Sequence, residues 1–261
     1  MKKISVLAFL FIFLFSSVAL AAMAVSMAPP NNTFYLKPKK KTREVIELEN
    51  RGFRPVRLKV YQAGFSIDEE GDLRFTPGEY SAEGWIRLNP EALKISPYDY
   101  GVVRYEIRVP EKVAPGSYTA SIMVEEEIEL PEGEKTAQFM IKGRLAHIIY
   151  VHVGKPVFVG RIEGLQAGRE KDDVKVVFTV INEGDFLFRL KGKLKIQNSE
   201  GKTFKELVVP NVPVLRRSRR RIRMTVPNGL SPGTYGAVLS LDIGAKSPLK
   251  AKTDFYVAGS D

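Results

Sequence analysis

Two stretches that repeat each other decide the fold: VPEKVAPGSYTASIMVE at residues 109–125 and VPNGLSPGTYGAVLSLD at residues 226–242. In each copy a Pro-Gly pair predicts a turn, and the residues after it continue as a late strand. The chain therefore holds two copies of one β-rich unit, which is too few for a solenoid array. Identical residues recur at the same spacing in the pairs Val109/Val226, Pro110/Pro227, Pro115/Pro232, Gly116/Gly233, Tyr118/Tyr235 and Ala120/Ala237.

The rest of the chain continues this β pattern. Apolar and polar residues alternate in the segments 44–49, 56–61, 103–109, 190–196 and 221–226, so that one face of each lies on a core and the other in water. A second echo pairs Asn50-Arg51-Gly52 with Asn182-Glu183-Gly184, each closing an alternating strand. Many short strands with regular turns are typical of an antiparallel sandwich.

The repeated tyrosines favour one kind of sandwich. Tyr118 and Tyr235 each follow the Pro-Gly turn by two residues, where the ring can be buried and the hydroxyl can bond nearby backbone. This is the tyrosine corner of immunoglobulin-like folds. We therefore predict an all-β chain of two tandem immunoglobulin-like antiparallel β-sandwich domains.

The N-terminus predicts export. Two lysines precede an apolar run from Ile4 to Leu20, and small residues follow it. This pattern is typical of a signal peptide, here residues 1–24, that is either cleaved or kept as an anchor. No later segment reaches the roughly 18 apolar residues that a membrane span needs. We expect an exported protein in the periplasm or at the cell surface, without a transmembrane segment in the mature chain.

We predict the domain boundary near Gly154-Lys155-Pro156, because Pro156 cannot donate a hydrogen bond to a strand ladder. Charged residues are distributed unevenly between the two sides of this boundary. Residues 25–154 carry 18 Lys and Arg against 19 Asp and Glu, whereas residues 155–261 carry 20 against 11. The positive field of the chain, whose net charge is +10, therefore belongs to the second domain.

The sequence contains little that indicates a catalytic or metal-binding site. The chain has no cysteine, and its two histidines, His147 and His152, would point to opposite faces of one predicted strand. No nucleophilic motif, phosphate loop or calcium loop is present. The acidic run Glu125–Glu129 is either a solvated loop edge or a weak calcium attractor. We expect no enzyme activity and no cofactor or metal.

Arginines cluster in the second half. In a predicted strand from Arg219 to Val226, every second arginine would share the outer face. Such a row suits a carboxylate or phosphate of an anionic envelope polymer, a lipid headgroup or an acidic partner, although a solvated face with ordinary ion pairs is the alternative. Nucleic acid is not expected, because no aromatic stacking platform is present. The candidate anion-binding residues are Arg216, Arg217, Arg219, Arg221 and Arg223, and Arg220 lies beside them at the start of the strand.

An ordered set of short motifs carries a family resemblance. The motifs are Phe34-Tyr35-Leu36, Val45-Ile46-Glu47-Leu48-Glu49-Asn50, Ser81-Ala82-Glu83-Gly84-Trp85-Ile86, Asn89-Pro90, Val109-Pro110 with Pro115-Gly116-Ser117-Tyr118, and Ala146-His147-Ile148-Ile149-Tyr150-Val151. Together they cover most of residues 28–153, which resemble the periplasmic pilus chaperones of the PapD-like family. The second domain is similar to immunoglobulin-like domains of envelope proteins such as the WxL-interacting proteins.

The resemblance implies binding by strand addition along a late strand, here residues 136–153, to an exported partner such as a surface or pilus-like subunit. The segment Glu125–Lys135 would be an exposed loop that opens this edge. The chaperones of this family grip the terminal carboxylate of a subunit with a basic pair, an arginine early in the first domain and a lysine in the late strand. This pair is not visible here, because residues 28–33 hold no arginine and the position of the lysine falls near His147. The partner-binding face would carry Phe139, Ile141, Leu145, Ile149, Val151 and Val153, unless these side chains fill their own core.

Two functions therefore compete. The first is an exported chaperone-like protein that engages a secreted or surface partner through the last strand of its first domain. The alternative is a structural envelope or cell-surface protein, attached to anionic envelope components through the arginine-rich face of its second domain. Salt sensitivity of binding would distinguish the second.

Overall fold

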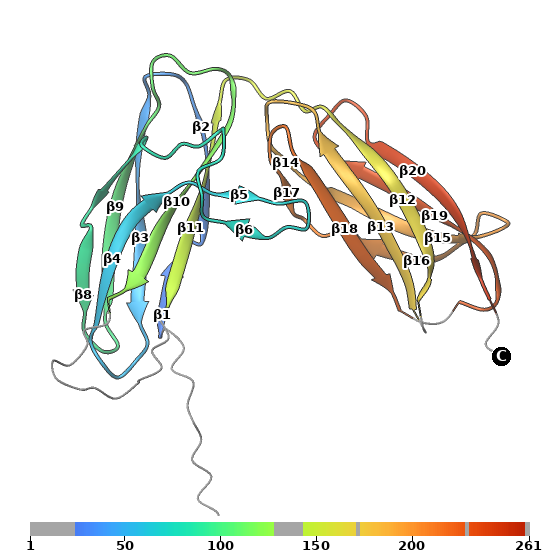
Figure 1. The fold of residues 1–261 in the computed structure, drawn as a ribbon, viewed down its shortest axis with the longest axis horizontal. Coiled ribbons are helices and arrows are strands. Elements are labelled where there is room, and N and C mark those ends of the chain that lie inside the picture. Colours follow the sequence, from blue (N-terminus) through green and yellow to red (C-terminus); the bar gives the residue numbers. More distant parts are fainter. Residues whose placement is uncertain (1–23, 128–142, 171–172, 228–229, 259–261) are drawn as a thin grey trace, which may run out of the picture.

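The chain forms two β-sandwiches that follow each other along the sequence (Figure 1). The computed structural model describes residues 24–127, 143–170, 173–227 and 230–258. Every regular element in these ranges is a strand, and none of the described residues forms a helix that could cross a membrane. The predicted all-β fold is confirmed.

Two facing sheets make the first sandwich. One has the strand order β1-β3-β9-β7 and the other β2-β11-β10-β4-β8, and a small hairpin, β5-β6, projects from them (Figure 1). The strands are β1 (Val25–Ala28), β2 (Asn31–Leu36), β3 (Lys41–Asn50), β4 (Val56–Ala63), β5 (Ser66–Ile67), β6 (Leu73–Arg74), β7 (Ile86–Asn89), β8 (Ala92–Ile95), β9 (Tyr100–Arg108), β10 (Gly116–Glu126) and β11 (Arg144–Val153).

The second sandwich follows after residues 154–159. Its sheets have the orders β12-β13-β18 and β16-β15-β19-β20, with a short β14-β17 ribbon. The strands are β12 (Gly160–Glu170), β13 (Asp173–Asn182), β14 (Phe188–Arg189), β15 (Lys191–Asn198), β16 (Thr203–Val208), β17 (Pro213–Val214), β18 (Arg219–Val226), β19 (Gly233–Asp242) and β20 (Leu249–Val257).

Alternation produces these sheets as the sequence predicts. In β3, Ile46 and Leu48 are fully buried, whereas Glu47 and Glu49 face water. The main core of the first sandwich is drawn from residues 25–153 and that of the second from residues 174–257. The division predicted near Gly154–Pro156 falls between the two cores.

The two copies of the repeat fold alike. Gly116 and Gly233 have φ of 152° and 154°, a backbone region that glycine adopts readily. Beyond each turn the tyrosine hydroxyl donates back to a carbonyl four residues earlier: Tyr118 to Ala114 at 2.9 Å and Tyr235 to Ser231 at 3.0 Å. Both predicted tyrosine corners are present.

The Asn-x-Gly echo also has a structural cause. Asn182 is 1 % exposed, its Nδ2 lies 2.8–3.2 Å from the carbonyl oxygens of Phe186, Val214 and Leu215, and its Oδ1 accepts from Gly184 N–H. Asn50 makes the corresponding set of bonds in the first sandwich, from Nδ2 to three carbonyls and from Gly52 N–H to Oδ1. Each asparagine thus joins two loops at one end of its sandwich.

One expectation about the region of the late strand is wrong, and another concerns residues that the structure does not describe. The loop was predicted from Glu125, but Glu125 and Glu126 belong to β10 and pair with Lys59 and Leu58 of β4. The late strand predicted from residue 136 is described from Arg144 onward. Phe139 and Ile141 lie outside the described residues.

Candidate binding surfaces

The late strand β11 is an inner strand along most of its length. It pairs with β10 from Arg144 to Val153 on one side. On the other side β2 runs parallel to it, but only from Ile148 to Val153. The stretch 144–147 therefore has a neighbouring strand on one side only among the described residues.

A strand switch explains why the edge opens there. β1 belongs to the opposite sheet, where it pairs with β3, and the chain crosses over at Pro29 and Pro30 to become β2. Pro30 supplies the first contact, since its carbonyl accepts from Ile148 N–H at 3.0 Å. Toward the start of β11 the crossing chain has left this sheet, so nothing described pairs with residues 144–147.

His147 stabilises this crossing point through hydrogen bonds. It is fully buried, and its Nδ1–H donates to the Pro29 carbonyl at 2.7 Å, which leaves Nε2 to accept from the Tyr105 hydroxyl at 3.2 Å. Asn32 Nδ2 donates to the same hydroxyl. Burial lowers the pKa of His147 and raises the pKa of Tyr105 to about 12. Both groups are therefore neutral and structural near pH 7.

The predicted partner-binding side chains differ in access. Ile149 and Val151 are fully buried in the core of their own sandwich, whereas Leu145 is half-buried against that core. Val153 is likewise buried. Access to a partner is thus greatest at the start of β11, around Leu145.

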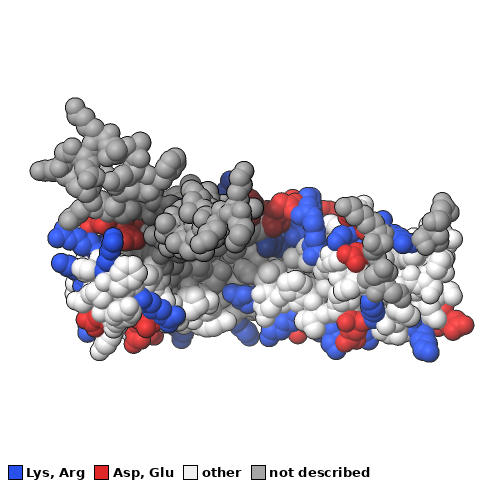
Figure 2. Space-filling model, turned by 90° about the horizontal axis from the view of Figure 1, so that it is seen from below, with Lys and Arg blue, Asp and Glu red and all other residues white. Residues whose placement is uncertain are grey.

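The arginine-rich face of β18 lies against the first sandwich. Arg219, Arg221 and Arg223 lie on the outward face, while Ile222, Met224 and Val226 are buried. The turn between β5 and β6, which we call the acidic turn (residues 68–72), contacts this face, and Arg221 N–H donates to the Glu69 carbonyl at 2.7 Å. Figure 2 shows basic and acidic side chains side by side at the junction of the two halves.

All five predicted anion-binding arginines pair with carboxylates of the same chain. Glu70 receives hydrogen bonds from Arg223 and Arg221, and the bond from Arg223 is the main cause of the lowered pKa of its carboxyl. An external anion would have to displace these partners. The pairs are Arg216–Asp185, Arg217–Asp185, Arg219–Glu163, Arg219–Glu69, Arg221–Glu69, Arg221–Glu70 and Arg223–Glu70.

Sequence reasoning missed the acidic turn. Its turn signal at Glu70-Gly71 is visible in the sequence, but the cations it would meet lie about 150 positions further on. The only signal in the sequence was the difference in net charge between the two halves. A strongly basic face favours contact with a less basic domain of the same chain.

Removing the acidic turn's charges should uncover the arginine face. We expect Glu69→Gln/Glu70→Gln to elute from a sulfonate cation-exchange column at higher salt than Glu91→Gln/Glu200→Gln, which has the same net charge. The reason is that the first variant frees neighbouring arginines on one strand, whereas the second removes scattered charges. Co-elution of the two variants would show that the turn does not mask the face.

An aromatic and polar contact completes the junction. The Arg216 guanidinium lies 3.7 Å from the centroid of the Tyr80 ring, and its Nη2 donates to Asp185 at 2.8 Å. The side chain is only 9 % exposed, and its Nε and Nη1 have no partner among the described residues. Phe65, Tyr150 and Leu187 form a small apolar cluster nearby. Arg216 is thus a buried interface residue.

A short hydrogen-bond chain crosses the same junction. Leu187 N–H donates to Ser117 Oγ at 2.8 Å, and Ser117 Oγ lies 2.8 Å from His152 Nδ1. Tyr35 stacks on the His152 ring at 4.7 Å between centroids, and Phe186 stacks at 6.2 Å. Burial lowers the pKa of His152 to about 4, so this histidine accepts from the serine hydroxyl as a neutral ring.

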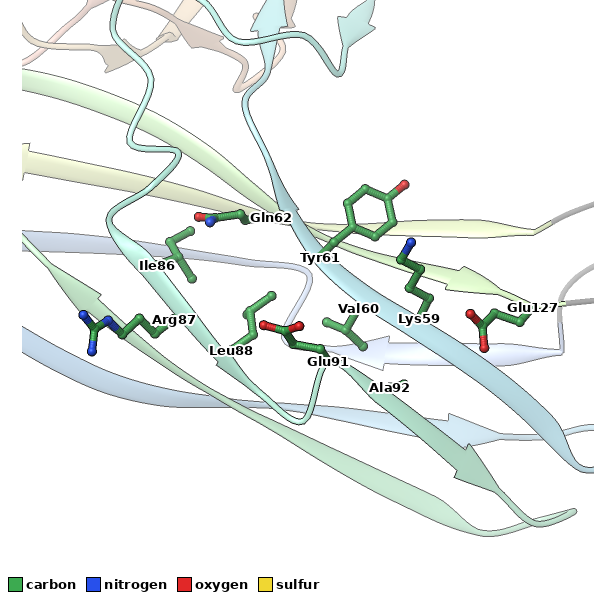
Figure 3. A pocket seen from close by; sticks show the side chains of 10 residues that line it. All are labelled: Lys59, Val60, Tyr61, Gln62, Ile86, Arg87, Leu88, Glu91, Ala92 and Glu127. Atoms are coloured by element: carbon green, nitrogen blue, oxygen red, sulfur yellow. The ribbon is translucent and has the colours of Figure 1, made fainter.

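A groove of about 710 Å³ lies between β4 and β7 (Figure 3). Val60, Ile86 and Leu88 supply apolar walls, and Lys59 and Glu127 stand at one end. No group of three or more metal-ligating side chains comes together anywhere in the described ranges. The groove therefore combines apolar and charged walls without a metal-binding set.

Known structures resemble this chain at low identity. The class 5 fimbriae chaperone CfaA is 11 % identical with a TM-score of 0.49, covering 88 % of this chain and 98 % of its own. The YadV chaperone is 11 % identical with a TM-score of 0.46, covering 89 % and 100 %. PapD-like domain 7 of human CEP192 is 19 % identical with a TM-score of 0.37, covering 60 % and 99 %. Two of these solved structures are chaperones, and the third is a PapD-like domain.

No family model matches the sequence, and no curated protein matches it.

Proposed function

We propose that this protein is an exported, chaperone-like binding protein that captures a β-rich partner by strand addition at the start of β11. The observation that supports the proposal is the one-sided edge at residues 144–147, where β2 has ended and β10 still pairs. An extended partner segment at this edge would gain main-chain hydrogen bonds and contact Leu145.

The backbone indicates which groups would meet the partner. Ile148 N–H bonds toward β2, whereas the Gly143 carbonyl accepts from Glu126 N–H of β10. Because successive residues of a strand direct their N–H and C=O groups to opposite sides, Arg144 and Ala146 direct theirs to the open edge. Strand addition would therefore use the N–H and C=O groups of these two residues.

A crosslinking experiment tests this edge. A photoreactive phenylalanine analogue at Arg144, which is exposed, should crosslink in intact cells to a specific exported protein. The same analogue at Tyr256, exposed on β20 of the other sandwich, serves as the control. If position 144 gives no product that position 256 lacks, no strand is added at this edge.

A backbone variant then separates strand addition from mere proximity. Ala146→Pro removes an N–H at the open edge, yet leaves the bonds between β11 and β10 in place. We expect it to reduce the Arg144 crosslink at least about tenfold, since it removes a central main-chain bond and its ring obstructs the added strand. Ala146→Ser keeps the N–H and should crosslink normally. Equal crosslinking of the two variants would contradict main-chain pairing.

The alternative, envelope attachment through the arginine face of the second sandwich, has less support. Intramolecular carboxylates already meet each of its five candidate arginines. The leading proposal needs no displacement of existing ion pairs.

A further inference from the structure

One outer sheet face of the first sandwich gathers five basic side chains, of which Glu106 contacts three. The face is formed by β3, β9 and β7, and its outward side chains alternate with buried ones. We call it the β3–β9–β7 patch. Its basic members are Lys41, Arg43, Arg87, Arg104 and Arg108, and its central acid is Glu106.

Strand register places these side chains in rows. Glu106 lies directly between Arg43 of β3 and Arg87 of β7. In the next row Arg104 lies between Val45 and Asn89. Rows are about 7 Å apart and strands about 4.8 Å apart, so the cations form a compact two-dimensional array.

One carboxylate is shared by three of the five cations. Arg43 Nε donates to one oxygen of Glu106 at 2.8 Å, and Arg108 Nη2 donates to the other at 2.9 Å. Lys41 Nζ lies 3.9 Å from the first. These cations, the Arg108 hydrogen bond first, lower the pKa of the Glu106 carboxyl. Both oxygens of Glu106 are therefore engaged.

The other two arginines of the patch do not contact Glu106. Arg87 and Arg104 are exposed and have no ion-pair partner in the part of the chain that the structure describes. In Figure 3 the Arg87 side chain points away from Ile86 and Leu88, its neighbours on β7. The β18 face contrasts with this patch, because there Glu69, Glu70 and Glu163 meet the arginines.

The patch is also hollowed. A concavity of about 650 Å³ is lined by Arg43, Arg87, Arg104 and Arg108, together with Glu44, Glu106 and Val45. Val45 is 42 % exposed, so one apolar side chain is accessible among these charged groups. Guanidinium groups around a concave floor can donate from several sides to oxyanions lying within it.

We propose that the β3–β9–β7 patch binds an extended polyanion that carries repeated phosphate groups. The cations are spread over three strands and several rows, so one phosphate could contact only part of them, whereas a chain of phosphates could contact them in turn. The inference is independent of strand addition at β11, which uses the opposite sheet.

The test uses fluorescently labelled long-chain polyphosphate and the protein from residue 24 onward, which holds both cores. Arg43→Ser/Arg87→Ser/Arg104→Ser should bind at least about tenfold more weakly at low salt, with a flatter dependence of affinity on salt. The control Lys155→Ser/Lys202→Ser/Lys246→Ser changes the charge equally at separated exposed positions and should lose less than about threefold.

Several results would overturn the proposal. Equal losses in both triple variants would assign binding to the overall charge of +10. Competition by orthophosphate as effective as polyphosphate at equal phosphorus would indicate a single-ion site. Tighter, patch-dependent binding to vesicles of phosphatidylglycerol would indicate a membrane. If the triple variant fails to fold, Arg87→Ser/Arg104→Ser replaces it, since neither side chain has an ion pair to lose, and the same criteria apply.

Discussion

Replacing Asn182 by alanine is expected to lower the free energy of unfolding by about 3 kcal/mol. The substitution leaves three carbonyls around the lost Nδ2 and the Gly184 N–H without their side-chain partner. At 1 % exposure the site gives water little access, so water does not replace the lost bonds, which together cost about 3 kcal/mol. Urea unfolding monitored by circular dichroism measures the difference.

Asn198→Ala is the matched control. Asn198 Oδ1 also accepts from two backbone N–H groups, those of Glu200 and Lys202, but in an exposed turn. Water can replace the side chain there, so the cost should stay below about 1 kcal/mol. Similar losses in the two variants would mean that burial does not set the importance of Asn182. Asn50→Ala should repeat the Asn182 result in the first sandwich.

Acid should destabilise the protein through His152. Its folded pKa of about 4 lies below the unfolded value of 6.5, so between these pH values the unfolded state binds more protons. Stability is therefore highest above pH 6.5 and falls as pH drops toward 4, with no further loss from this group below that. Over the whole range between the two pKa values, the loss of folding stability is about 3 kcal/mol. His152 is only 4 % exposed.

His152→Asn isolates this effect. An asparagine oxygen can accept from Ser117 roughly where Nδ1 does, but it does not titrate. The variant loses ring stacking at every pH, so its stability starts lower and then falls less steeply between pH 6.5 and 4. Urea unfolding at several pH values compares the slopes. Parallel slopes would show that His152 does not contribute to acid sensitivity.

Local sequence signals predicted the strands and their repeated ends. The alternation around Ile46 and Ile222 and the turns before Tyr118 and Tyr235 each depend on a few neighbouring residues, so they could be read directly. The outward row of arginines on β18 followed from the same period of two.

Features that depend on distant parts of the chain could not be predicted. The length of the open edge on β11 depends on where the crossing at Pro29 and Pro30 occurs in space. The β3–β9–β7 patch joins Arg43, Arg87 and Arg104, which no sequence period connects. Glu69 and Glu70, which pair with arginines of β18, come from the other sandwich. In each case pairing across long sequence separations decides the environment.

The bond between Glu69 and Arg221 has a consequence for solubility. β18 is the outer strand of its sheet, and an uncovered outer strand offers unpaired N–H and C=O groups to neighbouring molecules. Here the Glu69 carbonyl of the first sandwich pairs with one of these groups, the N–H of Arg221. Separation of the two halves would therefore expose a template for aggregation, on which the turn of a second molecule could take the place of the chain's own and create a swapped dimer.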